Sequence, residues 1–245
     1  MKNSKYRFIV PNLFTLFSLI TAVISLNMVL KDQFVIASWL IALSMFFDGL
    51  DGKLARLLNA SSKFGAMFDS VADFVAFGIV PAILAYRVVL HQLGFVGILL
   101  SSFFVGAGAF RLVRFTLQNL DVGTKHNFVG LPIPAAACLI SAYIIFNYYK
   151  WQMVLSVDIF AITIFLTAVL MISKIEYIAL EKKKKLTKES RLFIVLALVS
   201  VVIAIKFSYL IFGAWILTYI LYGIIRQITL ILRKSEDSQI TVSAD

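Results

Sequence analysis

Eight apolar runs, each close to the length of a membrane-spanning helix, make up most of the chain. They cover approximately residues 9–30, 34–54, 66–89, 94–116, 129–149, 153–173, 191–206 and 209–231. A helix needs about 20 apolar residues to cross the hydrocarbon core of a bilayer. The pattern therefore predicts an all-α integral membrane protein of about eight transmembrane helices, with residues 1–245 forming a single membrane domain. The polar end of the chain, residues 235–245, is expected to be disordered.

Composition and charge distribution agree with a membrane protein. Hydrophobic residues make up 61% of the chain and charged residues only 15%, too little polar surface for a soluble domain of this size. Of the 23 Lys and Arg residues, 19 fall on one side of the predicted spans, and the other side holds Lys31, Arg87, Lys150 and Lys206. The positive-inside rule then predicts a protein of the cytoplasmic (inner) membrane with both termini and the loop 174–191 in the cytoplasm.

The net charge of +10 is explained by basic residues that cluster at the ends of the apolar runs. No nucleic-acid partner is expected, because the sequence offers no soluble basic face. The Lys-rich run at 182–185 fits a solvated cytoplasmic loop, and it could also attract the anionic headgroups of membrane lipids.

One stretch, FDGLDGKLARLLNASSKFGAMFDSVADF (47–74), places four carboxylates at the ends of the second and third spans. Asp48 and Asp51 are three residues apart, and Asp69 and Asp73 are four apart, so each pair occupies one face of a helix. A short polar link at 59–63 joins the two spans into a hairpin. The two acidic pairs are therefore expected to face each other at the cytoplasmic end of that hairpin, which is the predicted active site.

Converging carboxylates at a membrane edge need positive charge to compensate them. Oxygen ligands suit Mg²⁺ or Mn²⁺, the absence of nearby His and Cys argues against zinc, and four carboxylates suffice for two ions. Such pairs act on phosphoryl groups. The small residues Gly49, Gly52, Ala55 and Gly65 either leave room for a ligand or simply allow close helix packing. A cation transporter is the alternative from another class, although its carboxylates would be expected near the midplane of several helices.

The spacing resembles the signature of the CDP-alcohol phosphotransferases, D-x-x-D-G-x-x-A-R, eight residues, then G-x-x-x-D-x-x-x-D. The matching positions are Asp48, Asp51, Gly52, Ala55, Arg56, Gly65, Asp69 and Asp73. The resemblance implies that the four aspartates hold two divalent ions and that Asp73, beside Asp69, deprotonates an acceptor alcohol. It also implies that Gly52, Ala55 and Gly65 accept a cytidine nucleotide whose phosphates contact Arg56.

Three further stretches bear on the substrates. VPNLFTL (10–16) carries Asn12 and Thr15, assigned to the nucleotide side, although a helix cap is an equally good interpretation. RLVRF (111–115) carries Arg111 and Arg114, which are acceptor candidates or topology anchors. FVGLPIPAAA (128–137) carries the acceptor candidates Gly130, Pro132 and Pro134, where prolines also suit the first turn of a helix.

Residues 10–137, which carry these motifs, are most similar to the integral-membrane phosphatidylserine synthases within that family. The shared stretches are PNLFT, the pattern ADF-AFG-PA at 72–82 and FVGLPIPAAA, whereas Ala76, Val113 and Thr116 stand where Ser, Ala and Asn are usual. This resemblance implies CDP-diacylglycerol and L-serine as substrates, CMP as a product, and it allows a homodimer. The closest alternative is a sister enzyme that uses glycerol 3-phosphate or an inositol phosphate.

Overall fold

The computed structural model describes residues 4–58, 60, 62–120, 128–177, 210, 212–225, 227 and 229. Its helices are α1 (Ser4–Leu30), α2 (Phe34–Leu57), α3 (Lys63–Asp73), α4 (Val80–Val88), α5 (Phe95–Leu120), α6 (Ile133–Trp151) and α7 (Val157–Ile172), with an apolar helix at Phe212–Ile225. A π-helical turn, Phe74–Ile79, joins α3 to α4, and a 3₁₀ turn, Leu90–Leu93, precedes α5. The strands β1 (Phe128–Val129) and β2 (Glu176–Tyr177) form a two-residue antiparallel ladder.

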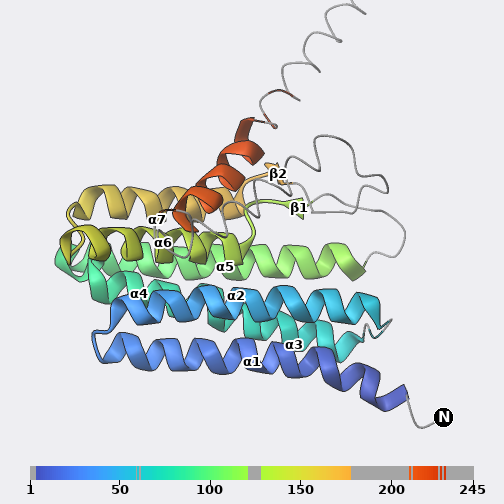
Figure 1. Ribbon diagram of the computed structural model, residues 1–245. Helices are drawn as coiled ribbons and strands as arrows, with labels where there is room; N and C mark the ends of the chain where they lie inside the picture. Colours follow the sequence, from blue (N-terminus) through green and yellow to red (C-terminus); the bar gives the residue numbers. More distant parts are fainter. Residues whose placement is uncertain are drawn as a thin grey trace, which may run out of the picture.

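The helices form a bundle in which α1 lies against α2 and α3, while α5 packs between α4 and α7 (Figure 1). The chain reverses direction between α1 and α2, between α2 and α3, between α4 and α5, and between α6 and α7 (Figure 1). The α1–α2 turn, the turn before α5 and the α6–α7 link lie at one end of the bundle. The N-terminus, the end of α2 and the start of α3 lie at the other end (Figure 1).

Four helices are long and apolar enough to cross a membrane: Ile9–Leu30, Phe34–Leu57, Lys63–Val88 and Phe95–Leu117. They match the first four predicted spans closely, which confirms a helical, multi-pass architecture. The helix α6 occupies the fifth predicted span. The helices α7 and Phe212–Ile225 are shorter apolar helices at the sixth and eighth predicted positions. The seventh predicted span at 191–206, the run 182–185 and the end 235–245 lie outside the described residues, so eight spans remain a prediction.

The π-helical turn has a local cause in Pro81. Proline lacks an N–H group, and its ring collides with the carbonyl four residues earlier when a regular α-helix continues through it. The turn just before Pro81 is wider, and its last hydrogen bond runs from the Val80 N–H to the Val75 carbonyl, five residues back. The chain therefore absorbs the proline within one continuous span, directly after Asp73.

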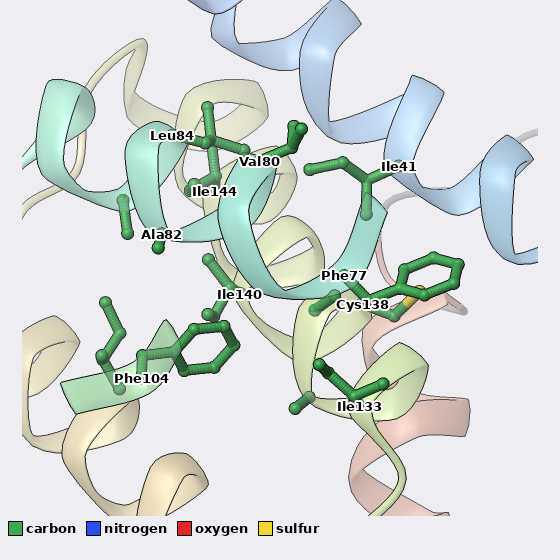
Figure 2. Packing of buried hydrophobic residues seen from close by; sticks show 14 of the residues in the cluster. Ile41, Phe77, Val80, Ala82, Leu84, Phe104, Ile133, Cys138, Ile140 and Ile144 are labelled. Carbon is green, nitrogen blue, oxygen red and sulfur yellow. The ribbon is translucent and has the colours of Figure 1, made fainter. Parts of the chain in front are cut away.

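The buried core fills the centre of the bundle with side chains from α2, the π-helical turn, α4, α5 and α6 (Figure 2). Two glycines create a notch in this core for the start of α6. A Cβ atom added at Gly108 would lie 2.6 Å from Cδ1 of Ile133, and one added at Gly78 would lie 3.6 Å from the same atom. Ile133 thus fixes the start of α6 against both α5 and the π-helical turn.

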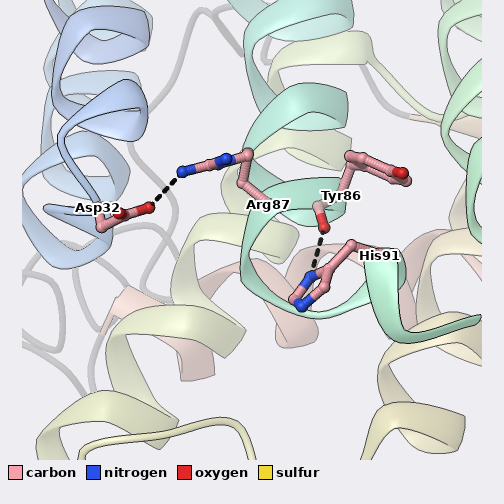
Figure 3. A network of polar contacts seen from close by, with 4 residues as sticks. All are labelled: Asp32, Tyr86, Arg87 and His91. Carbon is pink, nitrogen blue, oxygen red and sulfur yellow. Dashed lines mark hydrogen bonds and ion pairs between the residues drawn. The ribbon is translucent and has the colours of Figure 1, made fainter.

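At the end of the bundle away from the aspartate pairs, an ion pair links the α1–α2 turn to α4. Arg87 Nη2 lies 2.7 Å from Asp32 Oδ1, and nearby His91 Nδ1 lies 3.2 Å from the Tyr86 carbonyl oxygen (Figure 3). Asp32 has a φ of 57°, a left-handed conformation that Asp tolerates better than most residues. Both partners of the pair are exposed, so it contributes at most about 1 kcal/mol.

Candidate active site

Three carboxylates converge where α2 ends and α3 begins. Asp48, Asp51 and Asp69 each offer an oxygen, and these oxygens all lie within 4.8 Å of one another. Asp51 is only 4% exposed, and Oδ1 of Asp69 is buried with no hydrogen-bond partner among the described residues. Three carboxylates with oxygens this close together form the kind of oxygen-lined site that a hard divalent cation fits.

The start of α3 is built to bring Asp69 to this position. The Ser62 hydroxyl accepts a hydrogen bond of 3.0 Å from the Gly65 N–H and so caps the helix. A Cβ atom added at Gly65 would lie 3.0 Å from the Ser62 hydroxyl and 3.1 Å from Oδ1 of Asn12 on α1. Gly65 therefore permits α1 and the first turn of α3 to approach closely, with Asn12 at the contact.

The helix α1 also reaches the carboxylates directly. Thr15 Oγ1 donates a hydrogen bond of 2.6 Å to Oδ2 of Asp51, and Thr15 is almost fully buried. Farther along the same pair of helices, the hydroxyls of Ser18 and Ser44 lie 2.8 Å apart. The structure thus places both α1 candidates beside the hairpin: Asn12 lies against Gly65, and Thr15 orients Asp51.

Asp73 lies one helical turn beyond Asp69 and faces inward. Its carboxyl group is within hydrogen-bonding reach of Asp48, and the Arg111 guanidinium attracts both groups electrostatically. Arg111 is only 6% exposed, its guanidinium lies 5.4 Å from the centre of the Phe115 ring, and its Nε has no hydrogen-bond partner in the described part of the chain. A topology anchor would lie at the membrane edge, so this burial favours a role for Arg111 in the site.

Arg114 has a different environment from Arg111. Its guanidinium donates to the carbonyl oxygens of Ile172 at 3.0 Å, and of Met171 and Ser173 at 3.3 Å, at the end of α7. These carbonyls have no partner within their own helix, so a guanidinium is a suitable cap. Arg114 therefore holds α5 against the end of α7.

Gly130 completes this junction. It has a φ of 84°, and an added Cβ atom would overlap both the Met171 carbonyl and Nη2 of Arg114. The Gly130 N–H donates to the Ile175 carbonyl at 2.8 Å, and the Leu131 N–H donates to the Leu170 carbonyl at 3.0 Å. The N–H groups of Gly130 and Leu131 are therefore engaged by carbonyl oxygens of the fold itself. Pro132 caps α6 and Pro134 lies in its first turn, as the sequence predicts.

The nucleotide candidates lie on the open side of the hairpin. Gly52 is exposed, and an added Cβ atom would meet nothing within 4 Å; the same holds for Gly49. Ala55 is partly buried and Arg56 is exposed, with its Nε donating a 3.0 Å hydrogen bond to the Gly52 carbonyl. The surface beside Asp48 and Asp51 is therefore free of bulky side chains from these positions.

One residue near the site was not anticipated from the sequence. Tyr219, on the helix Phe212–Ile225, is partly buried and lies within electrostatic range of the Arg111 guanidinium. This helix packs against α6, since a Cβ atom added at Gly213 would lie 3.8 Å from that of Ala142. A lone tyrosine in an apolar run carries no motif, and only the packing of this helix brings it to the site.

Comparison with known proteins identifies the family. The family model described as CDP-alcohol phosphatidyltransferase matches residues 8–172. The chain belongs to the CDP-alcohol phosphatidyltransferase family. The matched region includes the acidic cluster, α1 and the start of α6, which confirms the resemblance noted from the signature.

Similar proteins within the family extend the comparison over nearly the whole chain. The CDP-diacylglycerol–serine O-phosphatidyltransferase of Helicobacter pylori (strain 26695) is 38% identical over 228 residues, or 92% of this chain and 94% of the relative. The protein of the same name from Methanocaldococcus jannaschii is 36% identical over 77% of this chain and 83% of its own length. The archaetidylserine synthase of Methanothermobacter thermautotrophicus is 34% identical over 68% of each chain.

Proposed function

We propose that this protein is a phosphatidylserine synthase, which transfers the phosphatidyl group of CDP-diacylglycerol to the hydroxyl of L-serine and releases CMP. The observation that carries the proposal is the convergence of Asp48, Asp51 and Asp69, with Asp73 and Arg111 beside them. This arrangement occurs in a chain whose relatives over almost its full length are named CDP-diacylglycerol–serine O-phosphatidyltransferases.

The acidic cluster suits a divalent metal. Oδ1 of Asp69 has no hydrogen-bond partner among the described residues, and oxygens of three carboxylates lie within 4.8 Å of one another. Mg²⁺ and Mn²⁺ prefer such oxygen ligands. In the proposal, two ions are held by Asp48, Asp51, Asp69 and Asp73. When bound, such ions neutralise phosphate charge and favour in-line displacement at phosphorus. Thr15 keeps one oxygen of Asp51 oriented for this task.

The donor nucleotide would occupy the open side of the hairpin. Gly52 leaves that surface clear, and the exposed guanidinium of Arg56 can turn from the Gly52 carbonyl toward a phosphate. Ala55, which is partly buried, follows on the same helix, and Gly65 keeps the first turn of α3 close to Asn12. These residues bind and orient the donor, and they leave the reacting phosphorus near the acidic cluster.

The acceptor would occupy the inner side, between Asp73 and Arg111. The serine hydroxyl oxygen attacks the lipid-side phosphorus, the bond from that phosphorus to the CMP oxygen breaks, and Asp73 takes the hydroxyl proton. Arg111 is suited to the serine carboxylate, because a guanidinium can donate two parallel hydrogen bonds to it. An acceptor that carries a phosphate dianion would need a second cation beside Arg111. Arg114 is the nearest arginine in the sequence, but its guanidinium is engaged by carbonyl oxygens at the end of α7.

We also propose that both termini and the acidic cluster face the cytoplasm of the cell. The basic residues support this orientation, since 19 of the 23 fall on the side of the predicted spans to which the aspartate stretch is assigned. Cysteine labelling of intact cells should leave Lys183→Cys unmodified and modify Lys150→Cys, which lies at the opposite end. Labelling of Lys183→Cys without labelling of Lys150→Cys would show the opposite orientation in the membrane.

The reaction can be tested with purified protein, CDP-diacylglycerol and Mn²⁺ or Mg²⁺. Serine, glycerol 3-phosphate and inositol phosphate are supplied separately, and CMP release is measured. Release that depends on serine is the expected result. Release that depends on glycerol 3-phosphate or inositol phosphate would instead assign a sister activity.

A further inference from the structure

An apolar groove runs along the outside of the bundle between α3 and α5. It has a volume of about 340 Å³ and is walled by Ser70, Val71 and Phe74 on one side and by Ala109, Leu112 and Val113 on the other. We call it the α3–α5 groove. Its volume is within the range of about 300–1,000 Å³ that is typical of ligand pockets.

The groove is open to the membrane along its length. Val71, Val113 and Leu117 at its margins are each 59–60% exposed, while Leu112 in its floor is 6% exposed. A contiguous exposed apolar surface marks a site of membrane or protein interaction, and on helices long enough to span the bilayer we take it to lie against lipid. The space can therefore be filled from the bilayer by a hydrocarbon chain without passing any polar barrier.

The groove adjoins the candidate active site along both of its walls. Ser70 follows Asp69, Phe74 follows Asp73, and Leu112 follows Arg111 in the sequence. Successive residues on a helix project about 100° apart, so the site and the groove occupy neighbouring faces of the same helical turns. A molecule with its phosphate at the aspartates can extend directly into the groove.

The groove is short enough to lie within one leaflet of a membrane. Leu117 marks the end nearer the cytoplasm and Ala109 the inner end, and the eight-residue step between them spans about 12 Å of helix. One leaflet contributes about 15 Å to the hydrocarbon core. The hydroxyls of Ser70 and Thr116 lie 3.5 Å apart, at the level where an acyl chain would join its polar glycerol ester.

Resting on the proposed function, we propose that the α3–α5 groove holds one acyl chain of the CDP-linked diacylglycerol while its phosphates lie at the acidic cluster. The lipid then stays in its leaflet during the reaction, and only its headgroup enters the polar site. Apolar contact in the groove contributes to donor affinity, and that contribution increases with each methylene group that the groove covers.

Donors of two chain lengths test this inference. The KM values for CDP-dioleoylglycerol and CDP-dihexanoylglycerol are measured in detergent micelles at saturating serine. Ala109→Phe fills the inner end of the groove and should raise the KM for the dioleoyl donor about tenfold, the effect of losing roughly two buried methylene groups. The KM for the dihexanoyl donor should stay unchanged, because its chains end before Ala109.

Val113→Trp provides a second variant at an exposed position, should Ala109→Phe perturb packing; it narrows the groove and should also raise the dioleoyl KM. Val96→Trp makes the same substitution at a 54% exposed position of α5 outside the groove, and it should change neither KM. An unchanged dioleoyl KM in both groove variants, or equal increases for both donors, would overturn the inference. A wild-type protein that releases no CMP from either donor refutes the proposed function itself.

Discussion

Thr15 on α1 donates a hydrogen bond of 2.6 Å to Oδ2 of Asp51 on α2, and this bond connects the first helix to the acidic cluster. The bond fixes which oxygen of Asp51 remains available to a ligand. Residues that orient a metal ligand in this way typically affect metal affinity or activity by about 10–100-fold.

Thr15→Val should therefore weaken Mn²⁺ binding about 10–100-fold, because valine keeps the shape of threonine but cannot donate. Thr15→Ser retains the donor and should stay close to wild type. Thr21→Val is the matched control on α1, since within the described part of the chain the Thr21 hydroxyl donates to the Phe17 carbonyl of its own helix and to no residue of the acidic cluster. The Mn²⁺ dependence of CMP release and of thermal stability measures the effect. Equal losses in Thr15→Val and Thr21→Val would point to a general effect on α1.

Asp69→Asn tests the acidic cluster with two readouts. Activity should fall on the order of 100-fold or more, because a lost ligand removes several kcal/mol of charge stabilisation. In EDTA, the Tm of the variant should equal or exceed that of the wild type, since one of three repelling carboxylates is gone. The rise in Tm on adding Mn²⁺ should shrink. A variant with normal activity and a normal Mn²⁺-induced rise would contradict the metal assignment.

The notch at Gly108 predicts a specific rescue. Gly108→Ala places a Cβ atom 2.6 Å from Ile133 Cδ1, which should destabilise the protein by about 1–3 kcal/mol. Adding Ile133→Val removes that Cδ1 atom and should restore most of the loss. Gly106→Ala is the control, because a Cβ atom there meets nothing within 4 Å. The Tm of each variant is measured by thermal unfolding in detergent. A double variant no more stable than Gly108→Ala would disprove the contact.

Arg111 and Arg114 should respond differently to lysine, although they are three residues apart. Arg111→Lys removes one of two charge-assisted hydrogen bonds to the serine carboxylate and should raise the serine KM at least about tenfold, with the donor KM unchanged. Arg114→Lys loses contacts with α7 carbonyls and should lower thermal stability while the serine KM stays normal. If Arg111→Lys keeps a normal serine KM, the carboxylate is bound elsewhere, and Asn12 becomes the next candidate.

Much of the fold and of the site follows from local sequence rules. The spacing of the aspartates on two helices joined by a short link predicts that they face each other, and Asp48, Asp51 and Asp69 do converge. Pro132 and Pro134 indicate the start of α6 because proline is tolerated only in the first turn. These signals are local, so a single sequence is sufficient to read them.

The features that the sequence could not predict depend on packing between distant segments. Arg111 and Arg114 look alike in the motif RLVRF, and only the position of the end of α7 separates a buried guanidinium from one that caps carbonyls. Tyr219 reaches the site through the packing of the helix Phe212–Ile225.

Transfer of the phosphatidyl group to serine can be measured by following labelled serine into the lipid product. Purified protein in micelles is given CDP-diacylglycerol, Mn²⁺ and serine labelled with ¹³C, and both the extracted lipid and the CMP are measured by mass spectrometry. The proposed function predicts labelled phosphatidylserine and CMP in equal amounts, with both lost in Asp73→Asn. CMP formed without label in the lipid fraction, or a labelled product that is not phosphatidylserine, would contradict it.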